Sequence, residues 1–337
     1  MKRNMREWLN ELKNSPVKKA MPILSFPAIQ LMNCSVKEIT SDSSLQAYGM
    51  KKIADMTDSA ASVSLMDLSV EAECFGSQIS ITEDEVPTVI DNIVSDMESA
   101  KALKIPKVGS ARSGVYIDAI KKATELIADR PIFAGVIGPY SLAARLLDVT
   151  EIMIYCYDEP DMVHIVLDKC TEFLIEYCKA YKAAGANGVV MAEPVTGLLS
   201  PDLAEEFSEP YVKRIVDAVQ DEEFIVIYHN CGDGTIAMID SILATGSAAY
   251  HFGNAIDMAE MMERIPSDII AMGNIDPAAE FCNGTIESIT DKTIQLLHKC
   301  GNYQNFVISS GCDIPPHSKW ENIGAFFDAV NQYYAKQ

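Results

Sequence analysis

One histidine and two cysteines carry the residue types in this chain that are most able to do chemistry. His229 and Cys231 lie two residues apart in FIVIYHNCGDG (224–234), at the end of a run of bulky, strand-favouring residues. On an extended strand, side chains at positions i and i+2 project from the same face, so the imidazole and the thiol point the same way. Cys312, in FVISSGCDIPP (306–316), stands at the same kind of boundary between a strand and a loop.

These three side chains form a ligand set that suits zinc. One imidazole and two thiolates leave a fourth coordination position open, which is typical of a catalytic rather than a structural zinc site. Soft sulfur ligands argue against magnesium or calcium. The same strand alternation predicts that Tyr228 and Asn230 face the other way. A His-X-Cys pair or a lone cysteine is also compatible with buried side chains that bind nothing, so the zinc interpretation depends on spacing and strand-end placement together.

The ligand set also limits what such a metal would do. A zinc ion with two thiolate ligands retains little positive charge and makes its bound water a poor source of hydroxide. It is better suited to bind the thiol of a substrate and to lower the pKa of that thiol, which then stays nucleophilic near neutral pH. The predicted reaction class is therefore alkyl transfer to sulfur.

Short apolar segments that alternate with helical patterns indicate the fold. Eight such segments end in Gly, Pro, Asn or Asp, and the pattern predicts an α/β protein, a (β/α)8 TIM barrel with parallel strands. A doubly wound open sheet is the alternative, but the first strand is not followed by a Gly-rich phosphate loop. The predicted strands are 21–28, 60–67, 132–139, 188–194, 224–232, 248–254, 269–277 and 306–313.

The spacing of these strands is uneven in the N-terminal half. The long interval between the second and third strands contains helical patterns in 83–104 and 113–130, so extra helices are predicted there. The chain is interpreted as a single barrel domain over 21–337, preceded by an N-terminal helix over 1–20 that packs outside the barrel.

Polar side chains gather where the predicted strands end, which is where active sites lie in this fold. Glu193 and Asp276 are assigned catalytic roles. Glu193 is expected to complete the zinc sphere or to accept a hydrogen bond from His229, with a helix-capping carboxylate as the alternative. Asp276 is expected to shape the mouth of the site, although Asp before Pro is also an ordinary turn.

Three further strand-end residues are assigned to cofactor binding: Asp67, His251 and Asn274. His251 is predicted to line the cavity. For His251, a core histidine with satisfied hydrogen bonds is the competing interpretation.

Composition excludes several classes of function. Lys and Arg total 27 against 48 Asp and Glu, a formal charge of −21, which opposes binding to nucleic acid or to an anionic membrane surface. The N-terminus has no apolar signal core, and no apolar run approaches the roughly 20 residues that span a bilayer. The nine cysteines show no disulfide framework. These features predict a cytoplasmic protein.

Several motifs together carry a resemblance to a known family. They are MPILSFPA with the following VKEITSDSSLQAYGMKKIADMTDSAASVSLMDLSVEAECFG, EPVTGLLSP, YHNCGDG, MGNIDP and SSGCDIPP, and they span nearly the whole chain. The sequence resembles the uroporphyrinogen decarboxylase superfamily and, within it, the methylcobalamin:coenzyme M methyltransferases. In that branch a His-X-Cys pair and a distant Cys bind zinc, and these positions fall on His229, Cys231 and Cys312.

The resemblance also implies partners and a mechanism. A corrinoid carrier protein would present a methylcobalamin-type methyl group at the barrel mouth, and a small thiol such as coenzyme M or homocysteine would accept it. Asp67 would then contact the corrinoid or the acceptor. The thiolate would attack the methyl carbon and cob(I)amide would leave, so that proximity and the lowered thiol pKa are the two catalytic terms. The sulfonate of coenzyme M calls for a basic residue, and Arg112, Arg145 and Lys319 are the candidates.

Two alternatives differ in kind from this interpretation. Decarboxylases of the same superfamily carry an arginine-rich segment after the first strand, whereas here that region reads FPAIQLMNCSVKE and contains no arginine. The other alternative is a non-catalytic barrel that binds a corrinoid protein without turning over a thiol.

Overall fold

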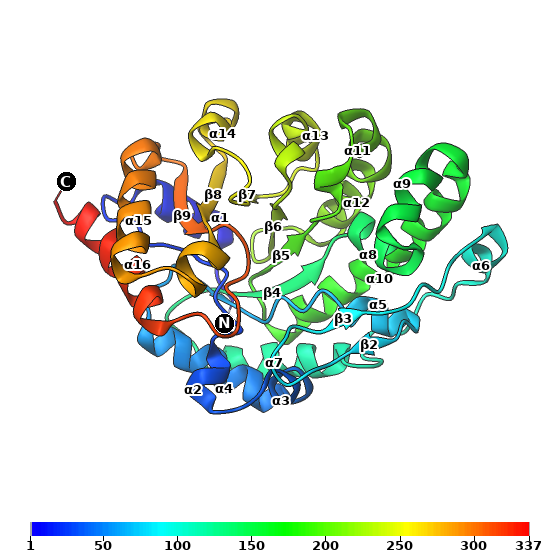
Figure 1. Cartoon of the computed structure of the whole chain (residues 1–337), viewed down its shortest axis with the longest axis horizontal. Coiled ribbons are helices and arrows are strands. Elements are labelled where there is room, and N and C mark those ends of the chain that lie inside the picture. The colour runs from blue at the N-terminus through cyan, green and yellow to red at the C-terminus, as the bar shows by residue number, and fades with distance from the viewer. Residues whose placement is uncertain (1, 337) are drawn as a thin grey trace.

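Seven parallel strands form the central sheet of the computed structural model, which describes residues 2–336. The sheet order is β1-β4-β5-β6-β7-β8-β9, and helices cover its outer side (Figure 1). Each strand is followed by helical segments, as a parallel βα barrel requires. The strands are β1 (Ser62–Val63), β4 (Ile132–Ile137), β5 (Gly188–Ala192), β6 (Ile225–Asn230), β7 (Ala249–Phe252), β8 (Ile270–Ile275) and β9 (Phe306–Ser310).

The helices run from α1 near the N-terminus to α16 near the C-terminus. They are α1 (Met5–Asn14), α2 (Ala28–Met32), α3 (Val36–Ser41), α4 (Ser43–Met56), α5 (Val70–Phe75), α6 (Met97–Ala102), α7 (Ser113–Leu126), α8 (Pro139–Leu147), α9 (Val149–Asp158), α10 (Pro160–Ala184), α11 (Pro201–Phe207), α12 (Glu209–Val219), α13 (Ile239–Ala244), α14 (Met258–Arg264), α15 (Ile286–Cys300) and α16 (Trp320–Tyr334). Three short turns of helix, η1 (Thr196–Leu198), η2 (Asp233–Ile236) and η3 (Pro277–Cys282), follow strands β5, β6 and β8.

The first predicted strand, 21–28, is a correction to the sequence analysis, because this segment forms no strand of the sheet. It nevertheless lies between the two edges of the sheet. The N–H of Met21 donates to the carbonyl of Ile308 on β9, and the N–H of Ala60, just before β1, donates to the carbonyl of Ala20. The segment therefore bridges β9 and β1 with too few bonds for a ladder. The other seven predicted strands are found in the sheet.

The prediction of extra helices in the N-terminal half is confirmed only in part. The pattern in 113–130 forms α7, whereas most of 83–104 is not helical. Within this range β3 (Thr88–Val89) pairs antiparallel with β2 (Ile79–Ser80), which lies just before it, and only α6 is helical. Pro87 explains the difference, since its ring removes a backbone donor and disfavours helical conformation in the residue before it.

Strand alternation divides the apolar side chains into two clusters. Inside the barrel lie Val190, Ile227, Met272 and Val307 with their neighbours. Intervening residues such as Tyr228 pack in the larger cluster between the sheet and the helices. His229 and Cys231 continue the inward series of Ile227, as the two-residue period predicts.

Helix α1 covers the end of the barrel where the strands begin. Its side chains Met5, Trp8 and Leu12 belong to the inner apolar cluster, and the Trp8 ring lies 5.5 Å from the ring of Phe133 at the start of β4. The backbone N–H of Met5 donates to the carbonyl of Glu222, just before β6. Among residues 2–336, no helix combines the length and apolarity needed to cross a bilayer.

We expect Trp8→Ala to lower the free energy of unfolding by about 3–5 kcal/mol, because it removes a large buried ring from the closed end of the barrel. Denaturant unfolding measures the change. Tyr157→Ala is the control, since Tyr157 is 71% exposed and its loss is expected to cost less than about 0.5 kcal/mol. Equal stability of the two variants would contradict a role for α1 in closing the barrel.

Candidate metal centre

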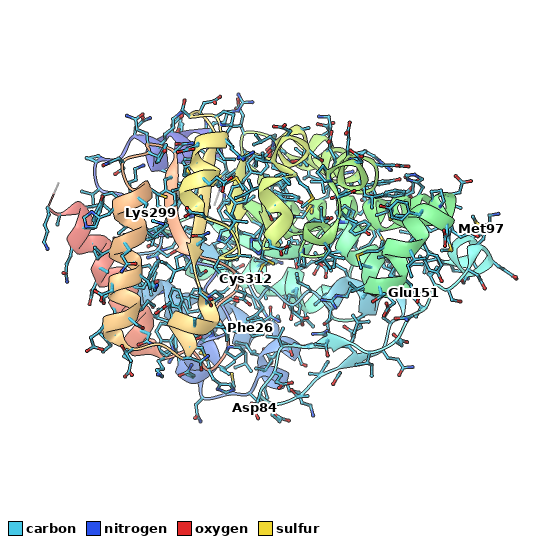
Figure 2. The ribbon with its side chains drawn as sticks, turned by 45° about the horizontal axis from the view of Figure 1, so that its top comes forward. Phe26, Asp84, Met97, Glu151, Lys299 and Cys312 are labelled. Atoms are coloured by element: carbon cyan, nitrogen blue, oxygen red, sulfur yellow. The ribbon has the colours of Figure 1, made fainter. Side chains whose placement is uncertain are left out.

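The three predicted metal ligands converge at the end of the barrel where the strands finish. His229 is the fifth residue of β6, Cys231 follows that strand directly, and Cys312 follows β9. One ligand atom from each lies within 4.8 Å of the other two. In Figure 2, Cys312 lies near the centre of the molecule, far from the peripheral residues Met97 and Glu151. Side chains more than 80 residues apart in sequence thus meet at one point.

The bonding state of His229 fits a metal ligand. Its side chain is buried, and its Nδ1 lies 2.8 Å from Nδ1 of His251. Its Nε2 is buried without a hydrogen-bond partner. A buried polar nitrogen without a partner is costly, and coordination to a metal would satisfy it. Imidazole nitrogen with two sulfurs is a donor set typical of zinc.

The two cysteines form a hydrogen-bonded pair rather than independent thiols. The hydrogen bond from Cys312 lowers the pKa of the Cys231 thiol to about 7. The same contact, together with burial, raises the pKa of Cys312 to about 12. Cys231 therefore loses its proton around neutral pH while Cys312 keeps its own, and a metal that binds both thiolates must displace the remaining proton.

A small cavity of about 90 Å³ opens directly onto this group. Most of its lining is apolar. Asp313 is the other ionisable side chain on its wall, and burial raises the pKa of that carboxyl well above its usual range. The cavity therefore suits the uncharged end of a small molecule. It is lined by Ile23, Met66, Leu68, Ala192, Pro194, His229, Cys231, Cys312 and Asp313.

A glycine permits the loop after β7 to approach Cys231. A Cβ on Gly253 would lie only 2.4 Å from Cα of Cys231, closer than any side chain allows. The N–H of Gly253 donates to the carbonyl of Asn230, which ties the two strand ends together. The backbone around Cys231 is therefore supported by the loop after β7.

Glu193 does not reach the three ligands. Its carboxylate accepts hydrogen bonds from the backbone N–H groups of Tyr140 and Ser141, and from the hydroxyls of Ser141 and Thr196. Burial raises the pKa of Glu193 to about 7, and these donors oppose the rise. The carboxylate thus caps the N-terminus of α8, the alternative considered from the sequence, and its contact with His229 is between backbones only.

Asp67 is likewise engaged in the fold. It is buried and forms an ion pair with Arg112, and it accepts hydrogen bonds from Tyr116 Oη and from the backbone and hydroxyl of Ser69. Arg112 also pairs with Glu73 at 2.7 Å. Both oxygens of Asp67 therefore have partners within the protein, although its neighbours Met66 and Leu68 line the cavity.

The remaining predicted site residues, His251, Asn274 and Asp276, differ in whether they contact a proposed ligand or only the surrounding loops. His251 contacts His229 directly. Asn274 donates to the carbonyls of Gly253 and Ile256 and so holds the loop after β7. Asp276 accepts from the backbone of η3 and from Asn254 at 2.9 Å, which makes it a turn-forming residue at the rim. Neither Asn274 nor Asp276 lines the cavity above the ligands.

None of the three basic residues considered for a sulfonate lines this cavity. Arg112 is paired with Asp67 and Glu73. Arg145 lines a separate cavity beside α8, and Lys319 donates to the carbonyl of Gly284.

Ser309 is a site residue that the sequence analysis missed. Its hydroxyl lies 2.7 Å from Nε2 of His251, and it donates to the carbonyl of Met21. Strand alternation contains the signal, since Ser309 is two residues beyond the inward-facing Val307. An inward polar residue on a buried strand needs a partner inside the barrel.

Comparison with known proteins agrees with this architecture. A family model described as uroporphyrinogen decarboxylase (URO-D) matches residues 13–333. A solved structure described as a methyltransferase from Methanosarcina mazei superposes with a TM-score of 0.85 at 24% identity, covering 97% of each chain. That match confirms the predicted barrel fold.

Two curated relatives represent different activities. A methylcobamide:CoM methyltransferase of Methanosarcina acetivorans is 28% identical over 274 residues, covering 79% of this chain and 78% of that protein. A uroporphyrinogen decarboxylase of Hydrogenovibrio crunogenus is 26% identical over 287 residues, covering 82% of this chain and 79% of its own length. Similarity to named relatives thus extends to both branches.

We expect the purified protein to bind one zinc ion per chain. Cys231→Ala or Cys312→Ala is expected to reduce the bound zinc to a small fraction of one ion per chain, since each removes one of three converging ligands. Metal analysis after dialysis measures the content. Cys282→Ala is the matched control, because Cys282 is also a partly exposed free cysteine but lies at the end of η3. Full zinc content in the Cys312 variant would exclude the proposed ligand set.

Zinc binding is also expected to release protons in a pH-dependent number. At pH 8 the Cys231 thiol, with a pKa of about 7, is mostly ionised while Cys312 is not, so binding releases about one proton. At pH 6 both sulfurs carry protons, so about two are released and the affinity falls. Calorimetry in buffers of different ionisation enthalpy counts these protons. An equal count at both pH values would show that the pKa of Cys231 lies outside the range between pH 6 and pH 8.

Proposed function

The chain belongs to the uroporphyrinogen decarboxylase family, and we propose that within it the protein is a zinc-dependent methyltransferase. The proposed reaction moves a methyl group from a methylated corrinoid, carried by a separate protein, to a small thiol. One observation carries the proposal: an imidazole with a free Nε2 and two thiols converge on the floor of an apolar cavity. The similarity to a methylcobamide:CoM methyltransferase supports it.

The residues of the chain have separable tasks in this reaction. His229, Cys231 and Cys312 would hold the metal and leave a coordination position toward the cavity. When bound there, Zn²⁺ supplies the positive charge that lowers the pKa of an acceptor thiol. The apolar walls formed by Ile23, Met66 and their neighbours limit water around the nucleophilic sulfur.

The bond changes require no general acid. The acceptor sulfur forms the new bond to the methyl carbon while the cobalt–carbon bond breaks, and both electrons of that bond remain on cobalt as cob(III) becomes cob(I). The proton of the acceptor thiol is lost before the attack. Two of the carboxylates at the strand ends, Glu193 and Asp67, are accordingly engaged elsewhere in the fold.

The acceptor is proposed to be a small thiol that enters with its uncharged end. Coenzyme M is a candidate because one similar protein is named as a methylcobamide:CoM methyltransferase. The cavity of about 90 Å³ accommodates a short carbon chain, and no lysine or arginine is among its lining residues. A sulfonate would therefore extend beyond the cavity, and homocysteine is a second candidate of similar length.

Uroporphyrinogen decarboxylation is the second candidate function, because another curated relative bears that name. A porphyrinogen has many carboxylates, whereas the formal charge of this chain is −21 and no lysine or arginine lines its cavity. Decarboxylation that persists after treatment with a chelator would favour this alternative. A barrel that only binds a corrinoid protein would consume no thiol even when loaded with zinc.

We place the reaction in the cytoplasm, because all nine cysteines are free thiols, as a reducing compartment favours. This placement is part of the proposal.

Incubation of the zinc-loaded protein with methylcobalamin and a thiol is expected to remove the methyl–cobalt absorption and to yield the methyl thioether. Cys312→Ala is expected to abolish turnover, and Cys282→Ala to retain it. Three thiols are tested in turn as the methyl acceptor: coenzyme M, homocysteine and 2-mercaptoethanol. Zinc-loaded protein that turns over no thiol, either with free methylcobalamin or with a methylated corrinoid protein, would exclude the proposed activity.

The cavity also predicts the degree of preference among these three thiols. Because its lining is mostly apolar and contains no lysine or arginine, kcat/KM for 2-mercaptoethanol is expected to lie within about tenfold of that for coenzyme M. A larger preference for coenzyme M would mean that a cation outside this lining binds the sulfonate.

A further inference from the structure

We infer that His251 and Ser309 are positioning residues that select the tautomer of His229, so that its Nε2 lone pair is directed at the metal position. The inference rests on the proposed metal centre, and it is independent of methyl transfer. It assigns to His251 a role different from the cofactor contact expected from the sequence.

A continuous chain of short contacts runs through the interior of the barrel. Nδ1 of His229 lies 2.8 Å from Nδ1 of His251, and Nε2 of His251 lies 2.7 Å from the Ser309 hydroxyl. That hydroxyl lies 2.7 Å from the backbone carbonyl oxygen of Met21. The three side chains are at most 2% exposed. Strand register explains the first contact, because His229 on β6 is paired directly with His251 on β7.

The carbonyl of Met21 determines which group donates and which accepts in each of these hydrogen bonds. A carbonyl oxygen only accepts, so the single proton of the Ser309 hydroxyl must lie between the two oxygens. The hydroxyl then accepts from His251, which places a proton on Nε2 of that ring. In a neutral imidazole the other nitrogen is an acceptor, so Nδ1 of His251 accepts from Nδ1–H of His229.

A second carbonyl supports the same direction at the other end. The carbonyl oxygen of His251 lies 3.3 Å from Nδ1 of His229 and can accept a hydrogen bond only if that nitrogen carries a proton. With the proton on Nδ1, the Nε2 of neutral His229 carries a lone pair. This is the same nitrogen that is buried without a hydrogen-bond partner. The free lone pair and the metal position therefore coincide.

The reverse direction is unfavourable at both ends. If Ser309 donated to His251, its oxygen would face the Met21 carbonyl across 2.7 Å without a proton between them. His251 would then donate to His229, whose unprotonated Nδ1 would face the His251 carbonyl. Two contacts between lone pairs in a buried site make this arrangement costly. It would also place a proton on Nε2, where the metal must bind.

Variants at His251 and Ser309 test the inference with zinc affinity as the first readout. His251→Phe removes the ring acceptor, and Ser309→Ala breaks the link to Met21. Each is expected to weaken zinc binding roughly 10-fold, as for other residues that orient a metal-bound histidine. Competition with a chromophoric chelator measures the affinity. His251→Gln keeps an acceptor and a donor on one side chain and is expected to recover part of it.

His164→Phe is the matched control. His164 is another histidine with partners on both ring nitrogens, Tyr211 and Glu206, but it is only half-buried and lies on α10 rather than on a strand of the barrel. Its replacement is expected to leave zinc affinity unchanged. Thermal unfolding of each metal-free variant identifies any that fail to fold, and Ser309→Thr keeps a hydroxyl where the alanine variant proves unstable.

The second readout is the tautomer itself. In metal-free protein labelled with ¹⁵N-histidine, His229 is expected to give the Nδ1–H pattern of chemical shifts, and His251→Phe to shift it toward a mixture. A dominant Nε2–H form of His229 in the parent protein, or zinc affinity within twofold of the parent in both variants, would overturn the inference. If the parent binds no zinc, the proposed function fails while the tautomer measurement still decides this inference.

Discussion

Closure of the barrel is the constraint on which the candidate metal centre depends. β6 carries His229 and β9 precedes Cys312, and two strands, β7 and β8, lie between them in the sheet. In a flat sheet, with strands about 4.8 Å apart, that separation would keep the side chains well beyond the reach of one ion. The curled sheet is bridged at its edges by the segment that contains Met21, whose N–H binds Ile308 of β9. The irregular first segment is therefore as important to the site as the regular strands.

The bridging segment also links closure to the orientation of a ligand. The N–H of Met21 donates to a carbonyl of β9. The carbonyl of Met21 accepts a hydrogen bond from the Ser309 hydroxyl, and this bond sets the direction of the hydrogen bonds through His251 to His229. Ile23, two residues later, lies on the cavity wall, and its N–H donates to the hydroxyl of Ser310. A short piece of backbone thus joins the sheet edges, orients an imidazole and forms part of the pocket. Displacement of this segment would disturb all three together.

The sequence was informative where a local periodicity decides the outcome. Alternation along β6 places His229 and Cys231 on the inner face with Ile227, and it sends Tyr228 to the outer cluster. The segment 21–28 could not be assigned in this way, because strand structure requires ladder bonds that depend on distant neighbours. Its apolar composition reflects burial between two edges rather than membership of the sheet.

The role of Glu193 depended on a partner that periodicity cannot identify. It follows the inward residue Ala192, and an alternating strand would turn it away from the cavity. Its actual partners are the first N–H groups of α8, more than 50 residues earlier in the chain. A helix N-terminus carries partial positive charge and unsatisfied donors, so it attracts a buried carboxylate. Burial and helix capping, rather than metal coordination, account for the carboxylate at this strand end.

The placement of the carboxylates has a consequence for charge at the centre. A divalent ion with two thiolates and a neutral imidazole is electrically neutral, so an incoming thiolate adds one negative charge. A carboxylate in the vacant position would compete with that thiolate and repel it. Capping of α8 by Glu193 and pairing of Asp67 with Arg112 keep both carboxylates out of that position. Asp313 is the carboxyl that does line the cavity wall, where burial raises its pKa and the Ser25 hydroxyl donates a hydrogen bond to it. The fold thus keeps two of its buried carboxylates, Glu193 and Asp67, away from the coordination position proposed for the acceptor thiol.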